Sequence, residues 1–269
     1  MTLYLSSAPH RTRPPGSLPT SSEPRPEAGL ALFCLPCAGG GASLYADWQE
    51  RLDALGAGVR VLPIRLPGRE ERAHEPRFTD LDALVADLDE QLDDAFSQPH
   101  VLYGHSMGAF IAHALTLARQ RRGAPLPRAL VLSSHRAPHI PPNRILDPDA
   151  DDETLATRLA ELGGISWELA RRPRFRAAYM PLVRDDLRLC SGWTDPADIE
   201  PLRVPLHLFT GLDDDLVPLP KMAAWRAVGG RGSTLLTMPG GHFFIRSHTD
   251  ELLRRLAEVV SRYGTAVAS

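Results

Sequence analysis

The sequence predicts an α/β protein in which helices cover both faces of a mainly parallel central sheet. Three features of the chain predict this fold class. Short apolar runs alternate with segments of helical periodicity, and a helical stretch at about residues 135–201 interrupts the alternation. A G-x-S-x-G pattern at residues 104–108 follows one apolar run and precedes a helical segment.

Six apolar runs are expected to form the strands, and turn residues such as Pro and Gly punctuate the chain between the elements. They cover residues 30–35, 59–66, 100–103, 129–133, 205–210 and 233–238. The segments expected to be helical cover residues 43–55, 81–96 (with Thr79 as N-cap), 107–118, 153–162, 167–171, 175–189, 219–228 and 248–263. Three of these helices fall in the interruption, which we expect to form a lid insertion over the carboxyl edge of the sheet.

Composition and charge exclude several function classes. The 269 residues carry 30 basic and 33 acidic side chains, so a net charge of -3 gives no overall cationic field to attract nucleic acid or anionic lipid. No stretch approaches the roughly 18 apolar residues that cross a bilayer. Three cysteines are too few for a disulfide scaffold and favour reduced thiols. We therefore expect a cytoplasmic protein with no nucleic-acid or membrane partner.

The domain organisation follows from a change of composition near the N-terminus. Residues 1–28 are rich in Pro, Ser and Arg and lack the apolar core of a secretory signal, so we expect a disordered tail. Residues 29–269 are expected to form one α/β domain that includes the lid insertion.

The strongest indication of function is Gly104-His105-Ser106-Met107-Gly108. The order strand, G-x-S-x-G, helix is typical of the nucleophile elbow, in which a serine on a tight turn is lifted clear of the sheet at a helix N-terminus. Side chains at the flanking glycines would collide with neighbouring backbone. The alternative is a chance Gly-Ser-Gly turn.

A serine nucleophile needs a base and an acid, and both are expected downstream. In the α/β-hydrolase order the acid follows a later strand and the histidine comes last. Asp214 lies in the turn after run 205–210, with Asp213 the nearest rival, and His242 lies in the Gly-rich turn after run 233–238. We predict Ser106, Asp214 and His242 as the triad, and we interpret the other histidines along these elements as packing or solvated residues. The acidic turn could also be a solvated turn or a helix cap.

The loop at residues 36–43 is where such hydrolases supply an oxyanion donor, and its small residues let the backbone approach a substrate closely. We assign the oxyanion hole to the backbone N–H groups of Ala38 and Met107. A phosphate-binding loop is excluded because no Gly-Lys-Ser/Thr follows. Redox chemistry at Cys34 and Cys37 is a weaker alternative, because their C-x-x-C spacing spans a strand end and not a helix start. No metal-ligand cluster is apparent.

These motifs resemble those of the type II thioesterases of polyketide and nonribosomal peptide assembly lines. The resemblance runs from about residue 29 to 263. It rests on the elbow together with the stretches 32–40, 66–70 and 240–244, and it extends to 179–186 in the insertion. One departure is Cys37, where the family commonly has histidine.

The resemblance implies an editing hydrolase that removes stalled or wrongly loaded acyl groups from the phosphopantetheine thiol of acyl or peptidyl carrier proteins through an acyl-serine. It implies no cofactor beyond that substrate-borne arm, and a lid over an acyl pocket. An acidic carrier protein would need a basic surface, and two arginine clusters could provide it or could be ordinary solvated helix faces: Arg119, Arg121 and Arg122, or Arg171, Arg172, Arg174 and Arg176. The rival functions are an esterase or lipase and a non-catalytic binding module on the same scaffold.

Overall fold

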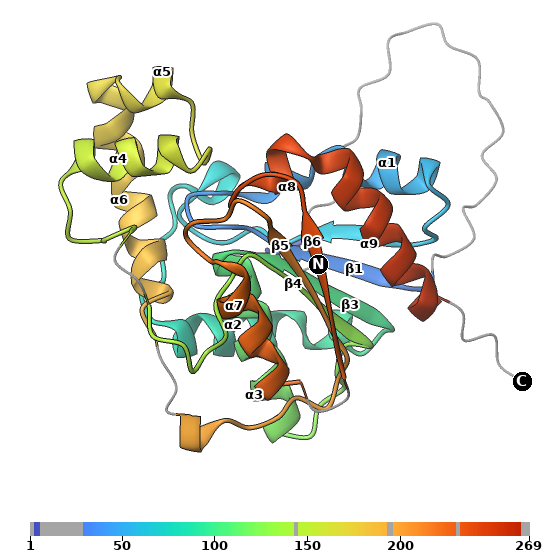
Figure 1. Cartoon of the computed structure of the whole chain (residues 1–269). Coiled ribbons are helices and arrows are strands. Elements are labelled where there is room, and N and C mark those ends of the chain that lie inside the picture. The colour runs from blue at the N-terminus through green and yellow to red at the C-terminus, as the bar shows by residue number, and fades with distance from the viewer. Residues whose placement is uncertain (1–2, 6–28, 143–144, 193–195, 230–231, 265–269) are drawn as a thin grey trace, which may run out of the picture.

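The computed structural model describes residues 3–5, 29–142, 145–192, 196–229 and 232–264. One sheet with the strand order β2-β1-β3-β4-β5-β6 forms its centre, and every neighbouring pair is parallel (Figure 1). The strands are β1 (Ala31–Leu35), β2 (Arg60–Pro63), β3 (His100–His105), β4 (Ala129–Ser133), β5 (Leu206–Gly211) and β6 (Ser233–Met238). Each of the six predicted runs forms a strand, so the predicted fold class is confirmed.

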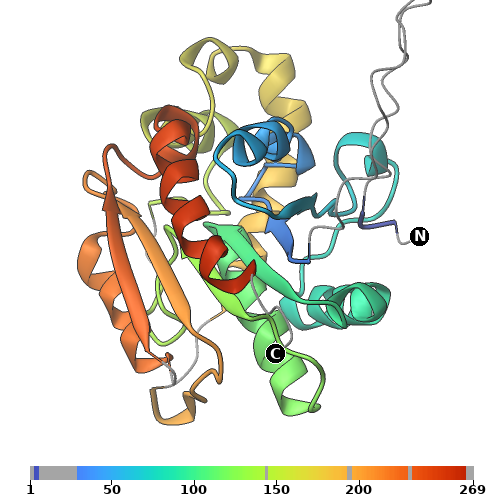
Figure 2. The same ribbon diagram turned by 90° about the vertical axis from the view of Figure 1, so that its right-hand side faces the viewer.

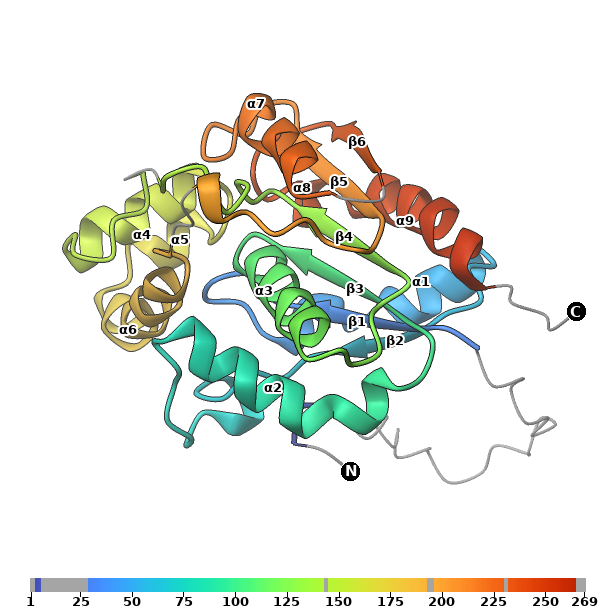
Figure 3. The same ribbon diagram turned by 90° about the horizontal axis from the view of Figure 1, so that it is seen from below.

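Helices cover both faces of the sheet (Figures 2 and 3). One apolar core joins the sheet to α2 (Leu81–Phe96), α3 (Met107–Arg121) and α7 (Leu219–Ala223), and the other joins it to α1 (Trp48–Ala54), α8 (Phe244–Ser247) and α9 (Thr249–Gly264). No helix within the described ranges is both long and apolar enough to cross a membrane.

Several predicted boundaries were wrong. The predicted helix at 43–55 is a 3-10 turn, Ala42–Tyr45, followed by α1, and the predicted helix at 219–228 is α7 followed by the 3-10 turn Ala224–Ala227. β2 is shorter than the predicted run 59–66 and covers only Arg60–Pro63. Asp80, and not Thr79, caps α2, because its side chain accepts the N–H of Ala83.

The insertion between β4 and β5 consists of α4 (Asp152–Glu161), α5 (Trp167–Ala170) and α6 (Pro173–Leu189). Figure 1 shows the three helices grouped together at one side of the sheet. They have a small apolar core of their own, formed by side chains such as Leu155 and Met180. The insertion is therefore packed internally, and α6 also contacts the helix α3.

The strand order places two loops side by side. The chain runs from β1 outward to β2 and then crosses back to β3 on the other side of β1. At such a reversal the chain leaves the two adjacent strands in opposite directions, so a crevice forms between the starts of the two loops at the carboxyl edge of the sheet. Here these loops are the residues after Leu35 and the turn after His105, which are the two segments predicted to carry the oxyanion hole and the nucleophile.

Part of the predicted tail is packed against the domain. Tyr4 is buried, its hydroxyl donates to the carboxylate of Asp87, and the guanidinium of Arg72 lies 4.5 Å from its ring centroid. Leu5 forms an antiparallel bridge with Ile64. The prediction of a disordered tail over residues 1–28 was therefore wrong for residues 3–5, because one aromatic side chain finds a partner that average composition cannot reveal. Residues 1–2 and 6–28 lie outside the described residues.

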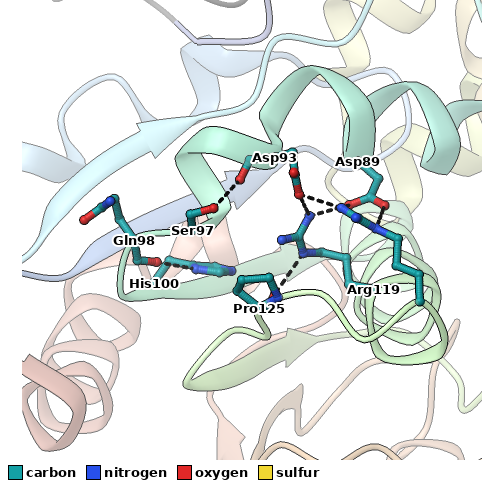
Figure 4. Close-up of polar contacts among 8 residues, drawn as sticks. Asp89, Asp93, Ser97, Gln98, His100, Arg119 and Pro125 are labelled. Atoms are coloured by element: carbon teal, nitrogen blue, oxygen red, sulfur yellow. Dashed lines mark hydrogen bonds and ion pairs between the residues drawn. The ribbon is translucent and has the colours of Figure 1, made fainter.

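The first predicted basic cluster serves mainly to join helices. Arg119 is fully buried, and its guanidinium bonds the carboxylates of Asp89 and Asp93 on α2 and the carbonyl oxygen of Pro125 (Figure 4). Arg122 bonds the same two carboxylates at 2.5–3.1 Å. A docking role for Arg119 is thus contradicted, because its charge is buried and neutralised between α2 and α3.

The turn from β3 into α3 brings backbone segments into very close contact. A Cβ on Gly108 would lie 2.1 Å from the carbonyl oxygen of Leu35 in β1, and a Cβ on Gly104 would lie 2.2 Å from the backbone of Gly108. A side chain at Gly108 would require the start of α3 to move away from β1, and one at Gly104 would require it to move away from β3. The two glycines of the motif are therefore required by packing and not by left-handed backbone dihedrals.

We expect Gly108→Ala to lower the free energy of unfolding by about 3 kcal/mol, because overpacking against backbone cannot relax by a side-chain rotation. Urea denaturation followed by circular dichroism measures the change. Gly29→Ala is the matched control, because a Cβ there meets no atom within 4 Å, and it should change stability by less than about 0.5 kcal/mol. Equal stability of the two variants would contradict this packing analysis.

Candidate active site

Ser106 has a strained backbone at the junction of β3 and α3. Its φ is 53° and its ψ is -118°, a conformation that is rare for a residue with a side chain. The surrounding structure holds it there, because its N–H donates to the carbonyl of Ser133 at 2.8 Å and its carbonyl accepts the N–H of Ala109 at 2.9 Å. The half-buried serine therefore stands at the N-terminus of α3, where the helix dipole favours negative charge.

The structure brings the three predicted triad residues into one hydrogen-bonded chain. Oγ of Ser106 lies 3.0 Å from Nε2 of His242, and Nδ1 of His242 lies 3.0 Å from Oδ2 and 3.2 Å from Oδ1 of Asp214. With the proton on Nδ1, the imidazole donates to the carboxylate and accepts the serine hydroxyl. This tautomer is the one in which a histidine acts as the base for a serine.

The geometry separates Asp214 from its rival Asp213. Asp214 is buried, and its Oδ1 also accepts the N–H of Val217 at 2.8 Å, which fixes the carboxylate toward the imidazole. Asp213 is exposed to solvent, and its own N–H donates to the carbonyl of Gly240. The two neighbours therefore have different tasks, one facing the histidine and the other joining the turn after β5 to the turn after β6.

The other histidines near these elements have packing partners. His105 is buried beneath the site, with Nδ1 2.9 Å from Oγ of Ser133 and its ring 5.4 Å from that of His242. Burial lowers the pKa of His105 far below its usual range, so it adds no positive charge next to the base. His207, in β5, bonds the hydroxyls of Thr234 at 2.8 Å and Tyr263 at 2.7 Å.

The two predicted oxyanion donors flank the serine. Ala38 lines the same cavity as Ser106 and His242, and Met107 is the first residue of α3, directly after the serine. Within the described part of the chain, neither backbone N–H has an acceptor. A buried or half-buried N–H without a protein partner is unusual and costs stability unless a ligand satisfies it. This pair is consistent with a place for an oxygen that develops negative charge.

Three charged side chains that the sequence analysis left without a role hold the loop containing Ala38. Arg69 and Asp186 are buried beside Gly39, and the carboxylate of Glu70 accepts the N–H groups of Ala42 and Ser43 at 2.8 and 3.0 Å. These residues lie in stretches that the sequence analysis quoted only for their family resemblance. Arg69 and Asp186 pair across 117 positions, and Glu70 bonds backbone 28 positions away, so neither contact leaves a local signal in a single sequence.

A cavity of about 330 Å³ opens beside the triad. Its wall comes from the loops after β4 and β5, from the turn after β6 and from the insertion. The lining is mainly apolar, with side chains that include Leu146, Leu159, Leu187, Val217 and Phe243. At this site a hydrophobic chain attached to a carbonyl could place the carbonyl at the serine and bury its tail.

A buried arginine is among the residues that line this cavity. Arg136 follows β4 and donates to the carbonyl oxygens of Ile140, Cys190 and Gly192 at 2.6–3.0 Å. Burial lowers the pKa of Arg136, while Cys190 beside it has a pKa raised to about 12 and is a neutral thiol. Arg136 therefore ties the exit of α6 to the loop after β4.

The redox alternative finds no support in the geometry of Cys34 and Cys37. All three cysteines of the chain are free thiols, and both of these are buried. Burial raises the pKa of each thiol, whereas a reactive cysteine needs a lowered pKa and some exposure. Cys37, the departure from the resembled family, is buried within the loop at residues 36–43. Among the described residues no group of three or more His, Cys, Asp or Glu side chains could hold a metal ion.

A strained serine on a strand-to-helix turn, linked through a histidine to a buried carboxylate on a parallel sheet, defines a serine hydrolase of the α/β-hydrolase fold. The sequence profile of the thioesterase domain family matches residues 31–259. The protein therefore belongs to the thioesterase family and is a thioester-hydrolysing enzyme.

Three similar proteins support the type II class that the sequence resembles. RedJ, a thioesterase from the prodiginine biosynthetic pathway in Streptomyces coelicolor, superposes with a TM-score of 0.79 at 33% identity and covers 91% of this chain and 96% of its own. YbtT, a type II thioesterase from the yersiniabactin pathway, gives a TM-score of 0.78 at 26% identity, with coverage of 90% and 96%. The gramicidin S biosynthesis protein GrsT from Aneurinibacillus migulanus is 30% identical over 226 residues, or 84% of this chain and 87% of GrsT. The predicted resemblance is confirmed.

We expect Asp214→Asn to lower kcat by about 10³- to 10⁴-fold, because an amide cannot hold the imidazole in the tautomer that accepts the serine proton. Steady-state hydrolysis of a small acyl thioester measures the loss. Asp213→Asn, on the adjacent exposed residue, should retain kcat within about twofold. A large loss in Asp213→Asn with normal activity in Asp214→Asn would reverse the assignment.

Proposed function

We propose that this thioesterase is an editing enzyme that removes stalled or wrongly loaded acyl groups from the phosphopantetheine thiol of acyl or peptidyl carrier proteins. The observation that carries the proposal is the chain Ser106–His242–Asp214 at the mouth of an apolar cavity of about 330 Å³. Support comes from relatives named for polyketide and nonribosomal peptide pathways, in which acyl groups travel as carrier-bound thioesters.

Acylation begins with proton transfer. Nε2 of His242 takes the proton of the Ser106 hydroxyl as Oγ forms a bond to the thioester carbonyl carbon. The carbonyl oxygen becomes an oxyanion, which the N–H groups of Ala38 and Met107 stabilise. Collapse of this intermediate breaks the carbon–sulfur bond, and the proton on His242 neutralises the departing thiolate. The product is an acyl-serine and a free carrier thiol.

Deacylation repeats the same steps with water. His242 removes a proton from water as the water oxygen bonds the acyl carbon, and the oxyanion forms again at the same two N–H groups. The imidazole then returns the proton to Oγ of Ser106 as the ester bond breaks, which releases a carboxylic acid. Asp214 stabilises the imidazolium in both halves of the reaction without itself becoming protonated.

Within this proposal the protein contributes every catalytic group, and the phosphopantetheine arm belongs to the substrate, so no cofactor is assigned. The apolar lining of the cavity favours the acyl chain, whereas the thioester sulfur must lie at Ser106 and the carrier protein outside the cavity. We also propose that the enzyme acts in the cytoplasm, and the three free thiols support a reducing compartment.

A carrier protein bearing a panel of acyl groups tests the proposal directly. We expect the wild-type enzyme to convert acyl-carrier to free carrier protein, and Ser106→Ala to lose at least about 10⁴-fold in kcat because the nucleophile is gone. Intact-protein mass spectrometry measures the acyl groups that remain. Differences among the acyl groups would identify those that the enzyme edits.

A p-nitrophenyl ester of equal chain length provides the comparison for the esterase alternative. We expect kcat/KM for the acyl-carrier to exceed that for the ester. A strong preference for the ester, still lost in Ser106→Ala, would contradict the editing role and leave a general esterase. Labelling of Ser106 by a fluorophosphonate without turnover of any thioester would favour a binding module.

The second basic cluster is the remaining candidate for carrier docking. Arg171, Arg172 and Arg174 are exposed where α5 meets α6, and the guanidinium of Arg171 lies 5.9 Å from the ring centroid of the half-exposed Trp167. Arg172 forms a surface ion pair with Glu168, one turn earlier, so its charge is less available to a carrier protein. Arg174 is therefore the most informative residue to change.

We expect Arg174→Glu to raise KM for acyl-carrier substrates several-fold and to leave KM for a small acyl thioester unchanged, because an acidic partner would meet a reversed charge. Arg121→Glu, on α3 in the other cluster, is the control and should leave both KM values unchanged. Equal effects of Arg174→Glu on both substrates would remove the docking role.

A further inference from the structure

The loop that carries the Ala38 donor is bound to α6 of the insertion through one buried carboxylate. Asp186 on α6 is fully buried, and its Oδ2 accepts the backbone N–H of Gly39 at 2.7 Å. The same carboxylate receives Arg69 in a bidentate pair at 2.7 and 2.8 Å. A buried, bidentate, charge-assisted pair is among the more rigid polar arrangements in proteins.

Gly39 is held from both of its backbone groups. Its carbonyl accepts the hydroxyl of Tyr179, also on α6, at 3.0 Å. The fit is close, because Gly39 has φ +70° and a Cβ there would lie 2.3 Å from the Tyr179 hydroxyl oxygen. The residue directly after Ala38 is therefore clamped by two side chains of one helix, two turns apart.

Arg69 completes the clamp and neutralises it. Besides Asp186, Nη1 of Arg69 donates to the carbonyl oxygen of Gly40 at 3.0 Å. A lone carboxylate at this place would oppose the negative charge that develops at the neighbouring oxyanion hole. Paired with the guanidinium, it holds the backbone without presenting a net charge to the reaction.

We propose that Asp186 and Arg69 are positioning residues that hold the Ala38 N–H in its oxyanion-binding orientation, so that the hole is complete only while α6 is docked on the loop. This inference rests on the proposed oxyanion role of Ala38. It also links the choice of acyl chain to catalysis, because Leu187, the residue after Asp186 on α6, lines the acyl cavity. An acyl chain that stabilises the docked helix thereby stabilises the donor.

The test compares two adjacent aspartates of α6. Asp186→Asn keeps the size of the side chain, but its NH2 group cannot accept from Nη2 of Arg69 as Oδ1 does, and the amide carries no charge to pair with the guanidinium. We expect kcat to fall about 10- to 100-fold with KM changed less than threefold. Asp185→Asn is the matched control. It removes the other ion pair between α6 and the body, Asp185 with Arg77 at 2.7 Å, without contact to the loop, and it should keep kcat within twofold.

A pair of inhibitors separates positioning from general damage. An acyl trifluoromethyl ketone forms a bond from its carbonyl carbon to Oγ of Ser106, the serine proton goes to His242, and the resulting oxyanion occupies the hole. The thioether of the same chain length fills the cavity but has no carbonyl. We expect Asp186→Asn to weaken binding of the ketone about 10- to 100-fold and to leave binding of the thioether unchanged.

The outcomes distinguish this inference from the proposed function. Unchanged ketone affinity in a folded Asp186→Asn variant would overturn the positioning role, whereas failure of the wild-type enzyme on carrier thioesters would overturn only the editing role, because the ketone assay does not use a carrier. If Asp186→Asn does not fold, Tyr179→Phe removes only the hydroxyl bonded to Gly39. That variant should lower kcat and ketone affinity together by about 3- to 10-fold, and unchanged values for both would equally overturn the inference.

A charge-pair variant adds a readout that loss of structure alone would not give. Arg69→Gln leaves the Asp186 carboxylate unpaired beside the oxyanion hole, so kcat should fall further than in Asp186→Asn. Adding Asp186→Asn to Arg69→Gln removes that charge and should raise kcat relative to Arg69→Gln alone. If the fold-loss in kcat of the double variant equals the product of the two single fold-losses, the electrostatic part of the inference is contradicted.

Discussion

The close contact between the start of α3 and the end of β1 is the constraint on which the rest of the site depends. Gly108 lies so near the carbonyl of Leu35 that no side chain fits between them. This contact lies two residues after the strained backbone of Ser106, and it brings the serine close to the loop that leaves β1. Nucleophile and oxyanion donors are therefore set by one packing contact in the rigid centre of the sheet, where backbone shifts are costly.

Electrostatics near the site follow a consistent pattern in which buried charges are paired. Asp214 faces His242 and also accepts the N–H of Val217, so its charge is stabilised where the imidazolium forms. Asp186 faces Arg69, so its charge is neutralised where the oxyanion forms. The Asp214 carboxylate pairs with the histidine that accepts the proton, and the Asp186 carboxylate pairs with a guanidinium. The difference in partners explains how two buried aspartates can lie near one active site, one stabilising the imidazolium and the other adding no net charge.

The sequence was informative wherever a feature is local, and silent wherever it depends on distant partners. The elbow, the order of acid and histidine and all six strands are marked by short patterns, so they could be predicted. The partnership of Asp186 with Arg69 spans 117 positions, and the burial of Tyr4 depends on side chains of another segment, so neither leaves a local pattern. The four-residue α8 was missed, although the equally short α5 was predicted.

The insertion contacts the catalytic centre in two ways, through apolar side chains at the cavity and through hydrogen bonds to the loop that contains Ala38. Its own small core lets α4, α5 and α6 hold together as one unit, and Arg136 fixes the chain just after α6 to the loop after β4. Between these points, α6 presents an apolar side to the acyl cavity and a polar side to the oxyanion loop. A shift of α6 therefore cannot widen the cavity without also disturbing the hydrogen bonds to Gly39. An enzyme that must act on some acyl groups and spare others gains discrimination from such coupling, because a chain that does not seat against α6 also fails to complete the site that would cleave it.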